Sequence, residues 1–423
     1  MDGRDKKLAL VRGDVVIWGI DIAKVRHWAR AVHPDATSAS EAVAFDNKRS
    51  GFERLRQAME DTATRWGVSR TVVAMEATGS YWRPLAQYLV DHGYAVVLVN
   101  PYHVKQEKEH PDNTPSKNDR KDCRIIAELA ARGNYLQPIL PRGPYAELRQ
   151  LTEARKEAVK DRTVAINRVW AVLGAFFPEL PEVFKSLSGK AAMWVLRHCP
   201  TPAAVQAMEV DDLVAGLKGA SLNRVGAKRA AALRDAAANS VGVRDGAAGA
   251  AERLRCHVDA LEQAVARVAR IEDSLAQALA ATDLDEVLCS VPGVGPVTAA
   301  MFLGEIGDLE VFTRGRQVVK LAGFHLTENR SGQHDGQTRI SKRGRPGLRW
   351  GMYMAALNVV RYCPEFQARY HHLTGRRENP LRRPQALVAV AMQLIRVLFA
   401  LAKSGHAYDP DKFAGAKTAS KAA

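Results

Sequence analysis

Four carboxylates stand at positions where an acid has a chemical use. Asp21 and Glu76 each come at the end of an apolar run, in VVIWGID and TVVAME. Asp119 and Asp122 are three residues apart in KNDRKD, a spacing that places both on one face of a helix. Gathered acids repel one another unless a divalent cation neutralises them. Carboxylate ligands favour Mg²⁺ or Mn²⁺, and such ions suit phosphodiester chemistry.

Each acid taken alone has a plainer interpretation. Asp119 or Asp122 could be a helix N-cap or a surface charge, and Glu76 could cap the helix that follows it. Asp21 is harder to explain in this way, because burying an unpartnered acid in an apolar strand is unfavourable. The residues alone leave a shared metal site and these separate roles both open.

A second candidate lies in a polar, glycine-punctuated loop late in the chain, LAGFHLTENRSGQHDGQTRISKRGRPGLRW, residues 321–350. Ser331 precedes Gly332, which lets the backbone turn closely around the hydroxyl. A serine beside guanidinium groups could attack phosphorus if a base or a metal took up its proton. Most loop serines are only caps or turn formers. The loop runs into a basic cluster that we expect to bind nucleic acid: Lys342, Arg343, Arg345 and Arg349.

The elements that must position the acids are strands and helices in alternation. The apolar runs and helical spacings of the first 135 residues predict three strands, a helix, a strand, a helix and a strand. This order predicts an α/β domain with a mixed sheet. The predicted strands are 15–22, 27–33, about 41–45, 71–75 and 95–99, the helices are 51–66 and 81–92, and a further helix carries Asp119 and Asp122 after the turn formers of 111–116.

Long helices are predicted for the middle of the chain, over 145–173 and 249–281. An intramolecular hairpin or a dimerising coiled coil would both bury the apolar seam of the second helix. The Ala/Gly/Val-rich stretch 200–250 is weakly patterned and suggests an insertion within the helical region. The seam consists of Leu254, Val258, Leu261, Val265, Val268, Leu275 and Leu279, and Glu272 breaks it once.

A compact helical domain is expected from Asp285 onward. Residues 288–307 place a Pro-Gly-Val-Gly turn between two apolar helices, where exposed backbone N–H groups could hold a phosphate. Any tight helix–turn–helix could use the same turn. The most apolar run, 386–402, contains Gln393 and Arg396, so we expect a buried helix and no membrane span. The tail after Tyr408 should fray.

The charge distribution points to a polyanion. The chain has 61 Lys and Arg against 46 Asp and Glu, a net charge of +15. Residues 311–423 contain 20 of the former and 6 of the latter, so nearly all the excess lies there. The five cysteines are scattered without a CxxC pair, which suits a reducing compartment. The first residues are too charged for a signal peptide, so we expect a cytoplasmic protein.

The ordered motifs of the first third resemble a known family. GIDIAK, MEATGSYWRPLAQYL, NPYHVK and KNDRKD together resemble the N-terminal domain of DEDD-type insertion-sequence transposases, also known as bridge-RNA-guided recombinases, to which pilin-gene invertases are similar. The resemblance implies a RuvC-like, ribonuclease-H-like fold. It also implies that Mg²⁺ or Mn²⁺ is held by four acids, Asp21, Glu76, Asp119 and Asp122.

The end of the chain resembles the transposase domain of the same family. VPGVG, an apolar helix, LAGF, a Ser-Gly loop and the ISKRG turn follow in the family's order. The resemblance implies that Ser331 is the nucleophile. Ser341 is the next candidate, which we expect to cap a helix or touch phosphate. The sequence departs from the family in having His334 and Asp335 in the serine loop, and in a longer region from about 173 to 250.

The resemblance and the residue patterns together predict a domain plan, and the resemblance implies a mechanism. The resemblance covers a RuvC-like domain at 14–135 and a mainly α transposase domain at 285–408. The residue patterns add a helical or coiled-coil linker with an insertion at 136–284 and a flexible tail at 409–423. Ser331 would form a 5′-phosphoseryl link, with donor and target DNA duplexes, a structured guide RNA, and dimers pairing into tetramers at the bacterial nucleoid. Further backbone contacts could come from Arg376, Arg377, Arg382 and Arg383, although a solvated charge run is the commoner role.

Three other functions are weighed against this one. A RuvC-like Holliday-junction resolvase or DNA invertase would use the acid tetrad, and a resolvase acting with water would give Ser331 no role. A sugar or acetate kinase of the actin-like fold could share the GIDIAK strand, but the second Gly-rich phosphate loop it needs is not found in the sequence. A non-catalytic nucleic-acid-binding protein fits the charge but not the acids.

Overall fold

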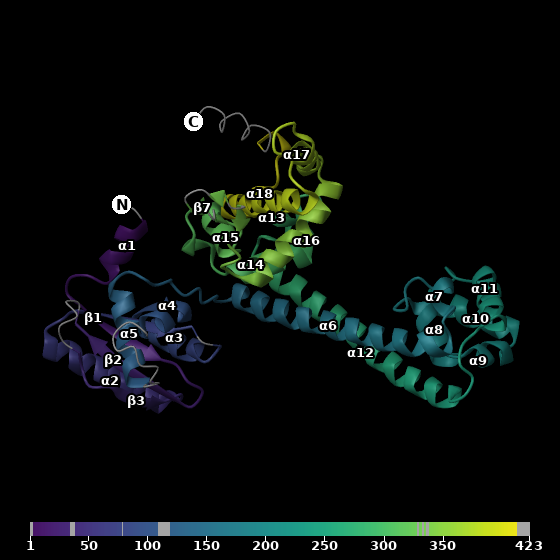
Figure 1. Cartoon of the computed structure of the whole chain (residues 1–423), viewed down its shortest axis with the longest axis horizontal. Helices are drawn as coiled ribbons and strands as arrows, with labels where there is room; N and C mark the ends of the chain where they lie inside the picture. The colour runs from purple at the N-terminus through teal and green to yellow at the C-terminus, as the bar shows by residue number, and fades with distance from the viewer. Residues whose placement is uncertain are drawn as a thin grey trace. The chain divides into compact units, whose positions relative to one another are not determined.

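The computed structural model describes residues 3–33, 39–77, 79–108, 119–327, 330–331, 334–335 and 338–412. The chain divides into two compact units, residues 1–140 and 141–423 (Figure 1). The predicted turn segment 111–116 and most of the predicted tail lie outside the described residues. The further subdivision of the second unit near residue 284 stays a prediction.

The first unit is built on a five-stranded mixed sheet. Its strand order is β3-β2-β1-β4-β5, in which β1, β4 and β5 are parallel and β2 and β3 are antiparallel to their neighbours. This confirms the predicted α/β domain and fits a ribonuclease-H-like fold. The strands are β1 Val15–Asp21, β2 Arg26–Val32, β3 Val43–Asp46, β4 Arg70–Glu76 and β5 Ala95–Val99.

Helices cover both faces of this sheet. Alternation along β1 sends Val16, Trp18 and Ile20 into the core under α2 (Arg49–Trp66) and α3 (Trp82–Asp91). The residues between them, among them Val15 and Ile17, enter a second core under α5 (Asp119–Ala131). Two shorter helices, α1 Gly3–Leu10 and α4 Pro101–Lys108, complete the unit.

A long helical hairpin begins the second unit. Helix α6 (Pro144–Phe176) and helix α12 (Ala247–Ala280) pack together along their length. Two ion pairs show that they run antiparallel: Arg155–Glu272 at 2.7 Å and Arg267–Asp161 at 2.9 Å. The apolar seam of α12 is therefore buried within one chain, whereas the dimerising alternative stays a prediction.

One member of the predicted seam was wrong. Val265 is 37% exposed, and Ala264 is buried in its place. The heptad pattern assumes one partner helix along one narrow line, whereas α12 packs against α6, α8 and α14, so its buried face is wider than that line and includes Ala264. Glu272, the polar residue within the seam, forms an ion pair with Arg155 of α6.

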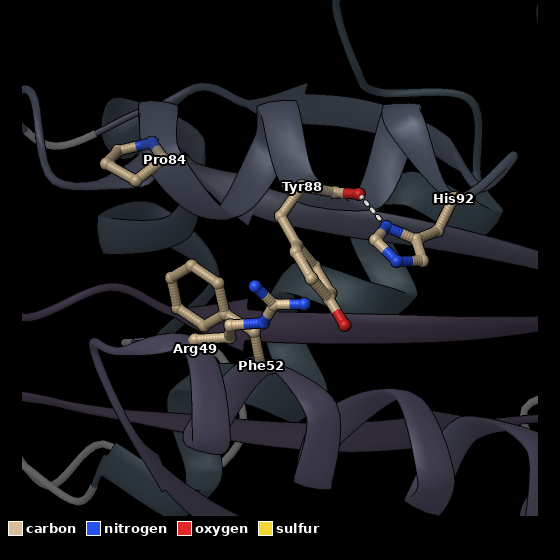
Figure 2. Close-up of a pocket in the computed structure, with 5 residues that line it drawn as sticks. All are labelled: Arg49, Phe52, Pro84, Tyr88 and His92. Atoms are coloured by element: carbon tan, nitrogen blue, oxygen red, sulfur yellow. Dashed lines mark hydrogen bonds between the residues drawn. The ribbon is translucent and has the colours of Figure 1, made fainter.

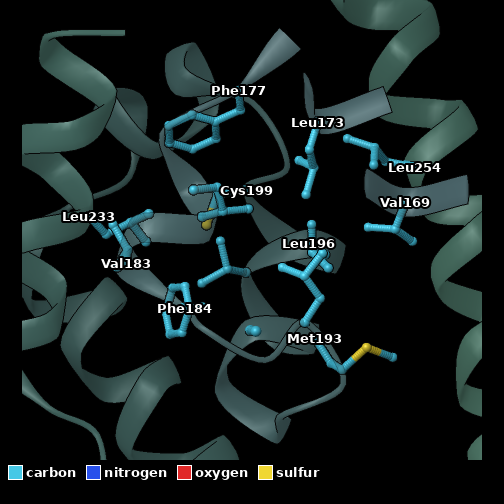
Figure 3. Close-up of a cluster of buried hydrophobic side chains, with 14 of the residues drawn as sticks. Val169, Leu173, Phe177, Val183, Phe184, Met193, Leu196, Cys199, Leu233 and Leu254 are labelled. Atoms are coloured by element: carbon cyan, nitrogen blue, oxygen red, sulfur yellow. The ribbon is translucent and has the colours of Figure 1, made fainter. Parts of the chain in front are cut away.

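Between the two hairpin helices, residues 177–246 fold into a helical lobe, and this lobe shares a core with the adjoining ends of α6 and α12 (Figure 3). Leu173, Phe177, Leu196, Leu233 and Leu254 are among its buried side chains. Three of the seven core members within residues 200–250 are alanines, and their short side chains made the apolar pattern of that stretch faint in the sequence. The lobe contains α7 Leu180–Val183, α8 Lys190–His198, α9 Pro202–Ala207, α10 Val210–Ser221 and α11 Ala227–Ala238.

The last part of the chain is a helical body with two small two-stranded sheets. Its helices are α13 Asp285–Cys289, α14 Pro296–Ile306, a 3₁₀ turn Leu309–Val311, α15 Gly315–Leu321, α16 Pro346–Tyr362, α17 Pro364–Gly375 and α18 Arg383–Ser404. Its strands are β6 Leu326–Thr327, paired with β9 Arg339–Ile340, and β7 Arg330–Ser331, paired with β8 His334–Asp335.

Helix α18 is long and apolar enough, by length and composition, to cross a membrane. It packs against α13, α15, α16 and α17 instead, and residues such as Leu394, Ile395 and Leu398 are fully buried. Its apolar character is therefore accounted for by the core of this body, as the sequence predicted.

Candidate active site

Strand register brings two of the predicted acids together. The parallel pairing of β1 with β4 matches Ile20 to Met75, and Asp21 and Glu76 are the next residues along each strand. Successive side chains of a strand point to opposite faces of the sheet. Ile20 and Met75 point into the core under α2 and α3, so Asp21 and Glu76 lie on the other face, the one under α5. Neighbouring strands are about 4.8 Å apart, so the two carboxylates share one edge and one face.

Helix α5 lies directly on this face. A Cβ atom at Gly19 would come within 1.9 Å of the Cys123 carbonyl oxygen, so only glycine lets the helix approach β1 so closely. The Cys123 thiol donates to the carbonyl of Trp28 at 3.1 Å, which fixes the helix against β2 as well. The sequence predicted the helix but not this contact.

Asp122 is consequently carried into the neighbourhood of Asp21. Its side chain is buried, with 9% exposed. Burial raises the pKa of Cys123 to about 12, and the negative charges of Asp21 and Asp122 act in the same direction. Asp122 precedes Cys123, whose carbonyl lies against Gly19 two residues before Asp21, so Asp21 and Asp122 both flank the contact between β1 and α5.

Asp119 is the first residue of α5, one turn before Asp122. Its side chain lies outside the described residues. Among the described residues, no group of three or more His, Cys, Asp or Glu side chains is close enough to hold one metal ion. The four-acid site therefore stays a prediction, of which the structure places three members around one face.

A cavity of the first unit lies away from these acids. It has a volume of about 430 Å³ and is lined by Arg49, Phe52, Pro84, Tyr88 and His92 (Figure 2). Helices α2 and α3 supply most of this lining, on the face opposite α5. None of the lining residues is a carboxylate, so the cavity is not part of the acid site.

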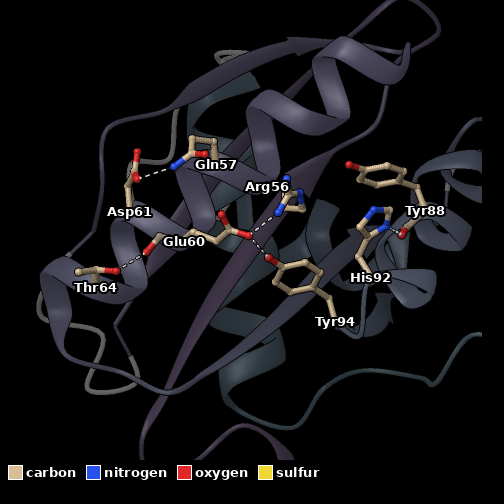
Figure 4. A network of polar contacts seen from close by, with 8 residues as sticks. All are labelled: Arg56, Gln57, Glu60, Asp61, Thr64, Tyr88, His92 and Tyr94. Atoms are coloured by element: carbon tan, nitrogen blue, oxygen red, sulfur yellow. Dashed lines mark hydrogen bonds and ion pairs between the residues drawn. The ribbon is translucent and has the colours of Figure 1, made fainter.

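A polar network beside that cavity holds α2 to the start of β5 (Figure 4). Glu60 pairs with Arg56 at 2.6 Å and accepts a hydrogen bond from the Tyr94 hydroxyl at 3.4 Å. Tyr94 precedes β5, whereas Asp21 and Glu76 end their strands. The network thus stabilises the amino ends of the parallel strands and leaves their carboxyl ends to the acids.

His27 is a residue that the sequence analysis did not single out. It is fully buried in β2, and its Nδ1 atom accepts a hydrogen bond from the Ala23 N–H at 3.1 Å. Burial lowers the pKa of His27. Because Ala23 belongs to the turn that follows Asp21, His27 shapes that turn. Its alternation with buried Ala29 and Ala31 was the available signal.

In the second unit, Ser331 lies on a narrow antiparallel ribbon. This serine lies in β7, which pairs with β8, and it pairs with His334. A second two-stranded sheet, β6 with β9, flanks this pair in the sequence, with Leu326 paired to Ile340. We call the two pairs together the ribbon, and the β6–β9 pair its base. The side chain of Ser331 is outside the described residues. The structure therefore gives the serine a backbone position, next to the His334 that departs from the family pattern.

Ser341 ties the base of this ribbon together. Its hydroxyl lies 2.9 Å from His325 Nδ1 and accepts the Arg343 N–H at 3.2 Å, and its own N–H donates to the His325 carbonyl at 2.8 Å. Of the two roles expected for it, the helix cap was wrong, since α16 begins only at Pro346, and contact with phosphate stays a prediction. The hydroxyl is used within the turn because the chain reverses at Lys342, which has a positive φ of 54°.

Two arginines of the predicted basic cluster make internal hydrogen bonds. Arg349 donates to the carbonyls of Ala322 at 3.0 Å and of Lys342 at 3.1 Å, and Arg345 donates to the carbonyl of Glu305. Both are half-buried, whereas Lys342 and Arg343 are exposed. Arg345 and Arg349 therefore hold the basic turn in place, and contact of the cluster with nucleic acid stays a prediction.

Glu305 joins this turn to the long hairpin and was missed from the sequence. It is 4% exposed, and its carboxylate pairs with Arg149 of α6 at 3.4 Å. A Cβ atom at Gly347 would come within 2.1 Å of its Oε1 atom, so the glycine makes room for the acid at the start of α16. A single acid inside an apolar helix, GEIG, was the available signal.

The other predicted basic residues surround the start of α18. Arg377, Arg382 and Arg383 are exposed, and Arg376 donates to the carbonyl of Asn379 at 2.7 Å. Their exposure leaves them accessible to a polyanion, but a solvated charge run would look the same.

Comparison with known proteins identifies the family. Residues 18–178 match the DEDD-type IS110 family model described as a transposase, and residues 285–371 match the model of the IS116/IS110/IS902 transposase family. Together the two matches cover more than half of the chain.

Full-length relatives support the same assignment. The IS116 protein of Streptomyces clavuligerus is 29% identical over 93% of this chain and 96% of its own length. The IS110 protein of Streptomyces coelicolor is 26% identical over 96% and 98%. A pilin gene-inverting protein of Moraxella bovis is 28% identical over 34% of this chain and 44% of its own length. The chain belongs to the IS110/IS116 family of transposases, enzymes that rearrange DNA.

Proposed function

We propose that this transposase cuts and rejoins DNA through a covalent link to Ser331, assisted by divalent metal at Asp21, Glu76, Asp119 and Asp122. The observation that carries the proposal is the register of β1 and β4. It puts Asp21 and Glu76 side by side on the face where α5 brings Asp122. A divalent cation would allow acids at neighbouring strand ends and on the helix packed over them to come together without repulsion.

The donor set fits Mg²⁺ or Mn²⁺. All four acids supply hard oxygen ligands, which these ions prefer over nitrogen or sulfur. The nearby Cys123 is not a competing ligand, because burial raises its pKa to about 12 and its thiol donates to Trp28. When bound, a divalent ion would polarise a phosphate oxygen and favour the ionised form of an attacking hydroxyl.

In the proposed step, the Ser331 oxygen forms a bond to phosphorus and the bond from phosphorus to the 3′ oxygen breaks. The serine proton is lost to a base and the 3′ oxygen gains one, leaving a 5′-phosphoseryl link and a free 3′ hydroxyl. The phosphodiester energy is kept in the link, so a new 3′ hydroxyl can reverse the step without ATP. Lys342 and Arg343, exposed after the ribbon, would contact the DNA backbone.

A covalent-trapping assay tests this mechanism. The purified protein is incubated with a labelled target duplex, Mg²⁺ and RNA from the non-coding end of the insertion element that encodes the chain. The mixture is then run on a denaturing protein gel. We expect a labelled band at protein mass that is absent in Ser331→Ala and in Asp21→Asn. Ser186→Ala, which removes an exposed serine of the helical lobe, is the matched control and should keep the band.

The opposite result would favour another enzyme. Cleaved DNA without an adduct, unaffected by Ser331→Ala, would point to a RuvC-like resolvase that uses water. Inversion is a second candidate outcome of the strand exchange, because relatives named as pilin gene-inverting proteins match part of this chain. A substrate with two sites in inverted orientation separates inversion from insertion.

The proposed partners are donor and target duplexes, a structured guide RNA and further copies of the chain, acting at the bacterial nucleoid. Omitting the RNA from the trapping assay tests the guide. Mixing Asp21→Asn protein with Ser331→Ala protein tests the oligomer. If acids and serine act from different subunits, the mixture regains part of the adduct that each variant lacks.

A further inference from the structure

Helix α16 carries an exposed apolar stripe that the proposed mechanism does not use. Trp350, Met354 and Leu357 follow one another at helical spacing and are 66%, 41% and 41% exposed. The opposite face, including Leu348, Met352 and Val359, is buried against the body. A helix that is apolar all round is usually enclosed on every side, so this face is expected to meet a partner.

Cations stand at both ends of the stripe. Lys342 and Arg343 are exposed just before α16, and Arg361 is exposed in its last turn. The helix itself, PGLRWGMYMAALNVVRY, has no carboxylate. Its N-terminus adds positive partial charge at the Lys342 end. The stripe therefore lies between two groups of cations. This arrangement suits a nucleic acid, which has anionic phosphates and flat bases.

A second copy of the chain fits this surface poorly. In a two-fold contact between stripes, antiparallel helices would bring Arg361 against the Lys342–Arg343 end of the other copy. Parallel helices would bring like ends together. Both arrangements place positive charge against positive charge, whereas DNA phosphates would neutralise it.

We infer that the α16 stripe is a DNA contact surface on which Trp350 stacks against an unpaired or unstacked nucleobase near the cut. Leu357 lies about 10 Å along the helix from Trp350, and Arg361 about 16 Å, so the stripe spans a distance similar to the major-groove width of about 12 Å. Met354 and Leu357 would contact base and sugar edges, and the cations at the two ends would contact phosphates. The inference deepens the proposed function and rests on it only in taking DNA as the substrate.

Arg349 relates this surface to the Ser331 ribbon. Its guanidinium bonds the Ala322 and Lys342 carbonyls at the base of the ribbon, and Trp350 is the next residue. The tryptophan is therefore anchored in the helical turn that supports the candidate nucleophile. A base held on Trp350 would be held close to the base of that ribbon.

A binding experiment tests the inference without any strand cleavage. The Ser331→Ala protein is titrated with two labelled duplexes of the same sequence, one fully paired and one with a short central bubble of unpaired bases. We expect tighter binding to the bubble, and we expect Trp350→Ala to weaken bubble binding by about tenfold to a hundredfold, the size of one base-stacking contact. Trp350→Phe should keep most of the affinity, because a smaller ring still stacks.

The matched control is Trp170→Ala, which removes an exposed tryptophan of α6, 39% exposed. It should leave both affinities unchanged. Equal affinity of the Trp350→Ala and parent proteins for the bubble would overturn the inference, as would an equal loss on both duplexes. If Trp350→Ala lowers the oligomer mass of the protein measured without DNA, the stripe is a contact with a second copy. If Trp350→Ala weakens binding to single-stranded RNA and leaves both duplex affinities unchanged, the stripe is a contact with RNA.

The binding experiment and the trapping assay distinguish failure of the DNA-contact inference from failure of the proposed serine mechanism. A missing adduct with an intact Trp350 effect would remove the serine mechanism and leave the DNA surface standing. A normal adduct with no Trp350 effect would do the reverse. Circular dichroism of Trp350→Ala checks the fold, which should persist because the side chain is two-thirds exposed.

Discussion

Two candidate sites hold their residues in different ways: the acid edge of the first unit, which is the sheet edge with Asp21 and Glu76, and the ribbon of the second unit that carries Ser331. Asp21 and Glu76 are placed by the register of two buried parallel strands, and Asp122 by a helix packed on them. Ser331 is placed by a two-stranded ribbon whose base depends on a few polar contacts, from Ser341 and Arg349.

The difference matches what each site would have to do. Metal ligands must keep fixed mutual distances, so positions within a buried sheet suit them. A nucleophile that carries a DNA end benefits from an extended segment on a supported base. Variants of the acid edge should therefore affect chemistry or the fold, whereas variants of the ribbon base should affect positioning.

Removal of one acid should have the largest effect. Asp21→Asn keeps the shape of the side chain but removes a charge, and we expect strand cleavage to fall by about 10³-fold or more. The measurement is the cleavage rate of labelled duplex against Mg²⁺ concentration. Asp14→Asn is the control, because Asp14 sits at the other end of β1 and accepts the Ser69 N–H at 3.1 Å. A similar loss of cleavage rate in both variants would contradict the assignment of the metal site to the carboxyl ends of the strands.

Crowding the contact between α5 and β1 should come next. Gly19→Ala would place a Cβ atom 1.9 Å from the Cys123 carbonyl oxygen. The helix must move away, which we expect to cost about 3 kcal/mol of unfolding free energy and to reduce cleavage. Chemical denaturation measures the first effect. Gly174→Ala on α6, with nothing within 4 Å of its Cβ position, should be neutral or slightly stabilising. An unchanged Gly19→Ala protein would show that the helix is not so tightly seated.

Loosening the ribbon base should have a moderate effect. Arg349→Lys keeps the charge but cannot bond both the Ala322 and Lys342 carbonyls with one planar group. We expect adduct formation to slow by about tenfold, with an unchanged dependence on Mg²⁺ concentration. Arg316→Lys, an exposed arginine of α15, should react at the parent rate. A changed metal dependence would mean that Arg349 acts on the acid site and is not a support of the ribbon.

A pH effect at His27 should be the smallest of the four. Burial lowers the pKa of His27 below the ordinary value of 6.5, so its neutral form is favoured in the folded protein. Its contribution to stability is complete above about pH 6.5 and is lost as the pH falls through the lowered folded value. We expect the melting temperature to drop over this range, and to drop less in His27→Gln. An identical pH profile in the two proteins would exclude His27 as the source.

The sheet and its acids could be predicted because their signals are local. Apolar runs predicted all five strands of the first unit to within two or three residues, and the positions of Asp21 and Glu76 at strand ends were visible in the sequence. The close approach of α5 to Gly19 could not be predicted, since it depends on contact between segments a hundred residues apart.

The second unit was less predictable for the same physical reason. The sequence predicts Val265 as a buried residue of the α12 seam, but packing in the folded protein buries its neighbour Ala264. Arg345 and Arg349 look like DNA ligands in the sequence but donate to carbonyls at the ribbon base. Basic residues can serve either purpose, and only the geometry of a turn tells which.

The long α6–α12 hairpin has a practical consequence for watching the protein at work. Of the five free thiols, Cys256 on α12 is the exposed one, while Cys123, Cys199 and Cys363 are buried and Cys289 is half-buried. Burial raises the pKa of Cys123 and of Cys199 to about 12, which slows their alkylation further. Brief maleimide treatment should therefore place one fluorophore on the helical arm, and energy transfer to labelled DNA would follow that arm during strand exchange without any engineered cysteine.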